Sequence, residues 1–254
     1  AKDRVVFTSQ AINSVLKQNL PQGTQVEVLV IDNGSTVPLE KILQNRFPQV
    51  KFLRYDGRQH PGATRNYGLK FAKGDFVAFL DNDDQWRPDF LKSSLEALEK
   101  NSAPATVCLT SPYFYGPYPF DQKVKLYFLN MIRTFVLSIS WFFNNKRLPF
   151  SGFYLCQISH MLFSARAIGK IRFNDFSVAA EDWEFVANIS RLKQIYILPQ
   201  PLVYFRYELR SNTNTPEVKQ KKWNSYRYLI KYLPASHKAG LLYKLFLGYI
   251  KIYS

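Results

Sequence analysis

The acidic cluster Asp81, Asp83 and Asp84 is the part of the sequence best suited to chemistry. It directly follows the apolar run 76–80. Residues at i and i+2 of an extended segment point to the same side, so Asp81 and Asp83 can aim their carboxylates at one point beyond a strand. Oxygen ligands without thiols suit Mn²⁺ or Mg²⁺, which share their shell with a substrate's phosphates. The pattern predicts a cation site; an ordinary turn before a helix is the alternative.

A second polar loop can join the acidic cluster. The residues 32–36 (Asp-Asn-Gly-Ser-Thr) follow the largely β-branched run 26–32, and the segment 60–74 opens a helix at Gly62 and leads directly into the acidic strand. Ligands of α/β sheets bind beyond the carboxyl ends of the strands. We therefore expect the loops 32–36 and 81–84 to meet at one crevice.

The elements that must position these loops alternate between helical and extended patterns. Helices are expected at 9–18, 39–47, from Gly62, at 88–100 and at 183–192, and strands at 26–32, 51–54, 76–80, 161–164 and 195–207. Such alternation predicts βαβ units, and hence a mostly parallel sheet flanked by helices.

Composition indicates one main domain with an appendage. The chain has 254 residues and 46% hydrophobic residues, which is ordinary for a globular protein. Cys108 and Cys156 have no metal-type spacing, which fits a reducing cytoplasm. The net charge of +15 predicts an anionic partner, and from Glu217 onward eight Lys or Arg face a single acid.

Two apolar stretches bear on membrane contact. The stretch 126–143 has about the minimum length for a bilayer span, but its polar residues form one stripe of a helix. The stretch 241–253 is amphipathic and fits either a membrane interface or packing on the protein's own core. The basic tail favours contact with the anionic inner face of the cell membrane.

Four motifs together resemble the family 2 glycosyltransferases of GT-A fold. They are IDNGST at 31–36, GATRNYG at 62–68, FLDNDD at 79–84 and AEDWE at 180–184. The resemblance covers 11–99 and resumes over 181–211. It implies an α/β GT-A domain over 1–212, with a variable acceptor-side region at 109–176, and a basic amphipathic helical tail at 213–254.

The same resemblance implies that the chain begins after the first strand of its fold. Family members open with an apolar strand and a short turn, and the residues 1–4 would fall at or just after that turn. The natural protein is therefore expected to be longer.

The resemblance also assigns roles in binding a nucleotide-sugar donor. Asp32 and Asn33 would hold the base and ribose, Arg65 would reach the diphosphate or the acids, Asp81 would contact the ribose and help place the metal, and Asp83 would be the direct metal ligand. The alternatives are a Gly-Ser turn for the loop 32–36 and a surface salt bridge for Arg65.

The acids Glu181 and Asp182 resemble the pair that supplies the catalytic base. Asp182 would take the proton of the acceptor hydroxyl as that oxygen attacks C1 of the sugar. The alternative is a pair that caps a helix start. Glu208 stands where many members have a metal-approaching His, and Arg206 and Arg210 can supply positive charge to a phosphate, although surface exposure is the commoner reading.

The predicted function is that of an inverting, Mn²⁺- or Mg²⁺-dependent glycosyltransferase. It would move a sugar from a UDP or dTDP donor to a saccharide or lipid-linked acceptor in surface polysaccharide or glycan synthesis. A non-catalytic nucleotide-sugar-binding subunit of the same fold is the alternative. A nucleic-acid binder is disfavoured because no motif of that class occurs and acids would line the main cleft.

Overall fold

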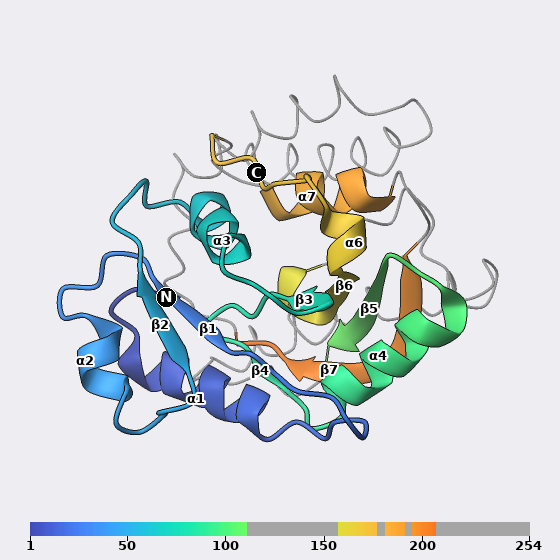
Figure 1. Cartoon of the computed structure of the whole chain (residues 1–254), viewed down its shortest axis with the longest axis horizontal. Helices are drawn as coiled ribbons and strands as arrows, with labels where there is room; N and C mark the ends of the chain where they lie inside the picture. Colours follow the sequence, from blue (N-terminus) through green and yellow to red (C-terminus); the bar gives the residue numbers. More distant parts are fainter. Residues whose placement is uncertain (111–156, 177–180, 191–194, 207–254) are drawn as a thin grey trace, which may run out of the picture.

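The structure is a computed structural model that describes residues 1–110, 157–176, 181–190 and 195–206 (Figure 1). Its helices are α1 (Val5–Leu16), α2 (Leu39–Leu43), α3 (Pro61–Leu69), α4 (Phe90–Asn101), α6 (Ala165–Ile168) and α7 (Glu181–Ser190), with a 3-10 turn at Ile158–His160. Its strands are β1 (Leu29–Asp32), β2 (Lys51–Arg54), β3 (Phe76–Ala78), β4 (Gln85–Trp86), β5 (Ala105–Thr110), β6 (Met161–Ser164) and β7 (Tyr196–Tyr204). The apolar stretches 126–143 and 241–253, the tail 213–254, Glu208 and Arg210 lie outside the described residues.

The strands form two hydrogen-bonded sheets. β1 pairs with β2 in parallel, with Asp32 opposite Arg54. The larger sheet has the order β3-β6-β5-β7-β4. Among the described strands of this sheet, β5 and β7 are the only pair that is parallel; the pairs β3–β6, β6–β5 and β7–β4 are antiparallel.

The mixed strand directions correct the prediction of a mostly parallel sheet. The expectation rested on alternation of helices and strands in the first half of the chain, where β1 and β2 do pair in parallel. β6 lies between β3 and β5 and runs against both. β4 lies at the other edge of the sheet, where it pairs with β7 and runs against it.

Local sequence explains how α3 begins. His60 is its N-cap, and the Nδ1 atom of His60 accepts a hydrogen bond from the backbone N–H of Gly62 at 3.1 Å. Pro61 occupies the first turn, where its missing N–H costs nothing. A Cβ atom on Gly62 would lie 2.9 Å from the carbonyl oxygen of Asn174. Glycine therefore lets α3 approach the segment that precedes α7.

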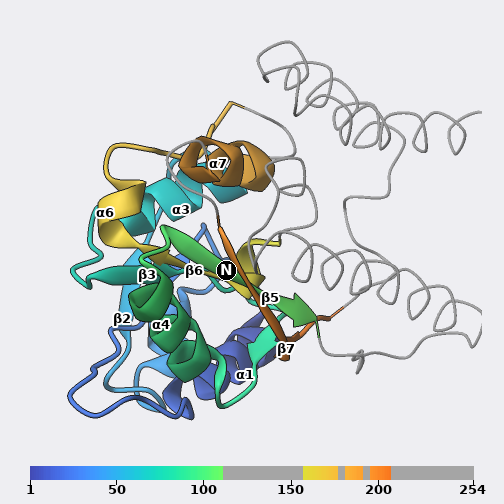
Figure 2. The same ribbon diagram turned by 90° about the vertical axis from the view of Figure 1, so that its right-hand side faces the viewer.

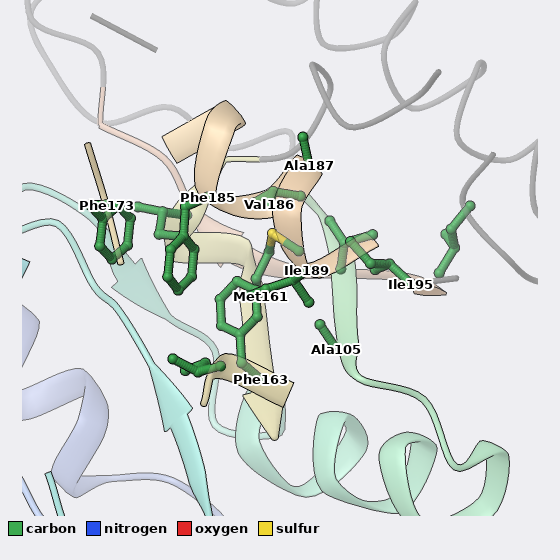
Figure 3. Close-up of a cluster of buried hydrophobic side chains, with 13 residues drawn as sticks. Ala105, Met161, Phe163, Phe173, Phe185, Val186, Ala187, Ile189 and Ile195 are labelled. Atoms are coloured by element: carbon green, nitrogen blue, oxygen red, sulfur yellow. The ribbon is translucent and has the colours of Figure 1, made fainter. Parts of the chain in front are cut away.

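The helices α3 and α7 lie side by side on one side of the strands, and α1 lies on the opposite side (Figures 1 and 2). The core between α7 and the sheet is rich in aromatic rings (Figure 3). The rings of Phe173 and Phe185 stack with centroids 3.9 Å apart, and Phe185 also meets Phe163 at 5.6 Å. This packing fixes the start of α7 relative to the end of β3.

Among the described residues, the structure contains no helix with the length and apolar character that crossing a membrane requires.

Candidate functional site

The acidic loop 81–84 connects β3 to β4 and is held by Ser159. The backbone N–H of Asp81 donates to Ser159 Oγ at 3.1 Å, and the N–H of Asp84 donates to the carbonyl of Asp81 at 3.0 Å. Ser159 in turn bonds to the carboxylate of Asp84. The loop is therefore a tight turn tied to the residues just before β6.

The three acids of the loop differ in their surroundings. The Asp84 side chain is buried, and burial, followed by the charge of Asp81, raises its pKa well above the ordinary value. Burial and Asp81 also raise the pKa of Asp83, against the effect of Arg4, whose Nη1 lies 2.8 Å from Asp83 Oδ2. The Asp81 side chain is 47% exposed. Asp81 and Asp83 thus face solvent at least in part, whereas Asp84 supports the loop from within.

Arg65 connects the acidic loop to the start of α7. Its Nη2 atom donates to Asp81 Oδ1 at 2.8 Å, and its Nη1 atom donates to Glu181 Oε1 at 3.0 Å. The Arg65 side chain is only 15% exposed, so these pairs are weakly screened by solvent. Although burial alone would lower the pKa of Arg65, the carboxylates of Asp81 and Glu181 raise it.

Asp182 has the electrostatic properties of a base that works near neutral pH. Burial and the charge of Glu181 raise its pKa to about 6, while Arg65 acts in the opposite direction. Its Oδ1 atom accepts a hydrogen bond from the backbone N–H of Trp183 at 2.9 Å. Such a carboxylate is mostly ionised at neutral pH but still basic enough to accept a proton in a reaction.

The Asp32 side chain organises the loop that follows β1. It is 2% exposed, and its two oxygens accept hydrogen bonds from the backbone N–H groups of Ser35 at 2.9 Å and Leu39 at 3.0 Å. Burial alone would raise its pKa, but these bonds and Arg54 hold it below the ordinary value. Next to it, Asn33 Oδ1 is buried and has no hydrogen-bond partner among the described residues. Of these two side chains, Asn33 has the unused acceptor.

Two neighbouring residues near the start of the chain, which no motif singled out, connect the two loops, because one contacts each of them. Asp3 Oδ1 accepts from the backbone N–H of Thr36 at 2.7 Å, and the N–H of Asp3 donates to Ser35 Oγ at 2.9 Å. The next residue, Arg4, pairs with Asp83. The loops 32–36 and 81–84 are thus joined through residues 3 and 4.

Arg206, which the sequence offered as positive charge for a phosphate, and Ser159, which it did not single out, also belong to this region. The backbone N–H of Arg206 donates to Asp84 Oδ1 at 3.1 Å, and its Nε atom donates to the carbonyl of Asp83 at 3.1 Å. Both contacts depend on the pairing of β4 with β7 and of β3 with β6, which no local pattern reveals.

The donor set fits a divalent metal only together with a phosphate ligand. Within residues 1–110 and the described segments after 156, no group of three or more His, Cys, Asp or Glu side chains is arranged to hold a metal. Asp81 and Asp83 would contribute two carboxylates. Mg²⁺ usually takes one or two carboxylates and completes its shell with water and substrate phosphates. A bound cation would also offset the like charge that raises the pKa of Asp83.

Solved structures share this fold. S. aureus TarS (residues 1–349) has a TM-score of 0.67 at 18% identity, with 99% of this chain and 70% of that chain covered. The mannosyltransferase PcManGT from Pyrobaculum calidifontis, solved with GDP-Man and Mn²⁺, has a TM-score of 0.68 at 15% identity, with 97% and 67% covered. The expected GT-A fold is confirmed.

Sequence relatives match a shorter part of the chain. The Escherichia coli UDP-Glc:alpha-D-GlcNAc-diphosphoundecaprenol beta-1,3-glucosyltransferase WfgD is 35% identical over 111 residues, which are 43% of this chain and 40% of that protein. The succinoglycan biosynthesis protein ExoO of Rhizobium meliloti is 36% identical over 101 residues, or 39% and 28%. An uncharacterized glycosyltransferase of Rickettsia felis is 35% identical over 102 residues, or 39% of this chain and 16% of that protein. The matched part spans less than half the length of each relative.

The family match extends further than these pairwise similarities. Residues 5–172 match the family described as Glycosyl transferase family 2. This range contains the loops 32–36 and 81–84 and the residue Arg65, which joins the acidic loop to Glu181. The chain therefore belongs to glycosyl transferase family 2.

Proposed function

We propose that residues 1–212 form the catalytic domain of an inverting glycosyltransferase that uses a UDP- or dTDP-sugar, with Mn²⁺ or Mg²⁺. The observation that carries the proposal is the bridge that Arg65 makes from Asp81 to Glu181, the neighbour of Asp182. This bridge ties the loop of Asp81 and Asp83, which could hold a metal and through it a phosphate, to the segment of Asp182, whose pKa is about 6. An inverting transferase needs a base beside the attacking hydroxyl and a charge-neutralising group beside the departing diphosphate, on opposite sides of C1 of the sugar.

In the proposed reaction the acceptor hydroxyl oxygen attacks C1 of the donor sugar, and the bond from C1 to the diphosphate breaks. Asp182 accepts the hydroxyl proton, and attack opposite the leaving group inverts the configuration at C1. Asp83 and Asp81 would hold a metal ion, which would neutralise charge on the departing diphosphate. Arg65 holds Glu181 in place through its hydrogen bond, and its own charge lies beside Asp81, where the diphosphate would bind.

The proposed donor preference rests on Asn33. Its buried Oδ1 atom has no partner among the described residues, and an amide oxygen can accept the N3–H of uracil or thymine. WfgD is named for a UDP-Glc donor, and TarS has been solved with UDP-GlcNAc. Asp32 would contribute indirectly, because its hydrogen bonds to Ser35 and Leu39 shape the loop that carries Asn33.

We propose a saccharide or lipid-linked acceptor and work at the inner face of the cell membrane, in surface polysaccharide synthesis. The acceptor in WfgD's name is attached to diphosphoundecaprenol, and ExoO is named for succinoglycan biosynthesis. The net charge of +15 favours an anionic surface. A non-catalytic nucleotide-sugar-binding subunit is the alternative, but it would have no use for the raised pKa of Asp182.

The test is the thermal stability of the full-length protein with UDP-, dTDP-, GDP- and CMP-sugars, each with and without Mn²⁺. We expect stabilisation by a uridine or thymidine donor that requires Mn²⁺ and is lost in Asp83→Ala, because a ligand that binds the native state raises its melting temperature. Asp89→Ala is the matched control, since Asp89 is an exposed acid that contacts Asn19 outside the site. Preference for GDP- or CMP-sugars would refute the donor assignment. No shift with any donor would refute the proposed function.

A further inference from the structure

We propose that Arg206 is a positioning residue that fixes the backbone of the metal-binding loop at Asp83. The inference rests on the proposed function, because it assigns Arg206 a part in holding Asp83 ready for the metal. From the sequence, surface exposure was the commoner reading for Arg206. In the structure its side chain is partly buried and contacts the loop and α1.

The first set of contacts joins Arg206 to the acidic loop. Its Nε atom donates to the carbonyl oxygen of Asp83 at 3.1 Å, and its backbone N–H donates to Asp84 Oδ1 at 3.1 Å. Both bonds come from the same residue, which follows the end of β7 and lies 122 or more positions from the acidic loop in sequence. The Asp83–Asp84 segment is therefore bound at its main chain and at its buried side chain together.

The second set of contacts holds the guanidinium of Arg206 itself. Its Nη2 atom donates to Gln10 Oε1 at 2.6 Å, and the group lies 4.2 Å from the centre of the Phe7 ring. Gln10 and Phe7 both belong to α1. Because α1 fixes the planar group at two points, the Nε–H can hold the Asp83 carbonyl in one orientation.

Arg4 shows that positioning and charge neutralisation are separate tasks at Asp83. Arg4 contacts the carboxylate, with Nη1 2.8 Å from Asp83 Oδ2, and its guanidinium carbon lies 5.9 Å from the centre of the Phe7 ring. The guanidinium of Arg206 donates instead to the main chain of Asp83 and to Gln10. Arg206 thus orients the residue, while Arg4 supplies the opposite charge to its carboxylate.

The consequence for metal binding follows from the precision that a ligand requires. Residues that orient metal ligands typically contribute about 10- to 100-fold to metal affinity. Loss of the bond to the Asp83 carbonyl would let this peptide rotate. The rotation would move the Asp83 carboxylate, which would be a ligand of the metal. Arg206→Ala is therefore expected to weaken Mn²⁺ binding in the presence of UDP by about 10- to 100-fold.

The experiment measures Mn²⁺ affinity with saturating UDP by electron paramagnetic resonance of free Mn²⁺, for wild type, Arg206→Ala and Arg206→Lys. Lysine keeps the charge but not the fork of donors, so we expect it to restore little affinity. The control is Arg87→Ala, because Arg87 is also partly buried and donates to a main-chain carbonyl, that of Pro201 at 3.4 Å. Unchanged Mn²⁺ affinity in Arg206→Ala, or an equal loss in Arg87→Ala, would overturn the inference.

A second readout does not depend on the metal. Hydrogen–deuterium exchange of the peptide that contains 81–86 should become faster in Arg206→Ala and stay at the wild-type rate in Arg87→Ala. If wild type binds no Mn²⁺ with UDP, the proposed metal-dependent reaction fails, and this exchange rate alone decides the positioning role. Unchanged exchange in Arg206→Ala overturns that role.

Variants of Gln10 replace Arg206→Ala if that protein does not fold. Gln10→Leu removes the acceptor of Arg206 Nη2 and should weaken Mn²⁺ binding and speed exchange in the 81–86 peptide. Gln10→Glu keeps the acceptor and should retain both properties. Equal behaviour of the two variants would contradict the inference.

Discussion

Arg65 and Glu181 lie 116 positions apart in the sequence, and Arg65 Nη1 donates to Glu181 Oε1 at 3.0 Å. The two side chains are 15% and 12% exposed. They belong to α3 and α7, which lie side by side (Figure 1). Because the same guanidinium also binds Asp81, the charge of Arg65 acts on the acidic loop and on the acid pair at once.

Arg65→Gln is expected to shift the pH dependence of catalysis. Arg65 lowers the pKa of Asp182, against burial and Glu181, which raise it to about 6. Without the guanidinium, this pKa rises further, so the acidic limb of a plot of kcat/KM against pH moves to higher pH. The measurement is the pH–rate profile of wild type and variant. A lower rate with the limb at its wild-type position would contradict this account.

The same substitution should lower stability. Removing one partner of a buried ion pair leaves uncompensated charge, at a cost of about 3–5 kcal/mol. Asp56→Asn is the control, since the Asp56 side chain is 68% exposed and surface pairs such as the one it makes with Arg54 contribute roughly 0–1 kcal/mol. Urea denaturation of both variants compares the two costs.

Asp182→Asn is expected to reduce kcat by about 10²- to 10⁴-fold, the usual contribution of a positioned base. The variant should also be more stable than wild type at pH 8. The pKa of Asp182 is raised from 3.8 to about 6 in the folded protein, so the ionised carboxylate costs stability above pH 6. As the pH falls from about 6 towards 3.8, the carboxyl protonates in the folded protein and the cost disappears.

Melting temperatures at pH 8 and pH 4 test whether the ionised Asp182 carboxylate destabilises the folded protein. Asp182→Asn should exceed wild type at pH 8 and approach it near pH 4, whereas the exposed acid variant Asp89→Asn should show no such trend. A variant that loses stability at both pH values would mean that the Asp182 carboxylate is a structural group.

The sequence predicted the elements whose signals are local. β2 and β6 have the predicted bounds, and α3 and α4 begin close to Gly62 and Pro88, because glycine, proline and apolar periodicity act within a few residues. The position of the acidic loop after β3 was likewise readable, because the apolar run 76–80 leads directly into the acids. β1 is shorter than expected, since it begins at Leu29 rather than at residue 26.

Contacts between distant segments could not be predicted in this way. The pairs Arg4–Asp83 and Asp81–Ser159 join residues 79 and 78 positions apart. They depend on the order and direction of strands, and antiparallel β6 lies where a parallel arrangement was expected. The hydrogen bonds that Asp32 accepts from Ser35 and Leu39 could not be predicted either, because the sequence does not distinguish a carboxylate that caps a loop from one that binds a ligand.

Asp32→Asn is expected to destabilise the fold. Its carboxylate accepts from the backbone N–H groups of Ser35 and Leu39, and an amide would place a donor against one of them. An unsatisfied buried donor costs about 1–3 kcal/mol. The pKa of Asp32 is lowered in the fold, so its ionisation stabilises the native state above its unfolded pKa, and this contribution fades as the pH falls through the lower folded value.

Urea denaturation at pH 7 and near pH 3 measures this effect. The cost of Asp32→Asn should be largest at pH 7 and smaller near pH 3. Asp56→Asn, which alters an exposed acid nearby, is the control and should be close to wild type at both. An Asp32→Asn protein as stable as wild type, but unable to bind UDP, would instead assign Asp32 directly to the nucleotide.

Phe185→Leu is expected to impair catalysis as well as stability. Phe185 is fully buried on α7, and its ring lies 3.9 Å from that of Phe173 and 5.9 Å from that of Phe79 (Figure 3 shows Phe173 and Phe185). Phe79 stands two residues before Asp81, and Phe185 three residues after Asp182. A smaller side chain lets α7 shift relative to β3, and with it Asp182 relative to the acidic loop.

The matched control is Phe47→Leu, which shortens an equally apolar side chain, 3% exposed, in the separate cluster beneath α2. Both variants should lose stability in urea, by less than the roughly 3–5 kcal/mol of a full Phe→Ala truncation. At a temperature where both remain folded, only Phe185→Leu should lower kcat, because a small displacement of a catalytic group is enough to slow the reaction. Equal kcat values would mean that the aromatic cluster supports the fold without setting the distance between the base and the metal loop.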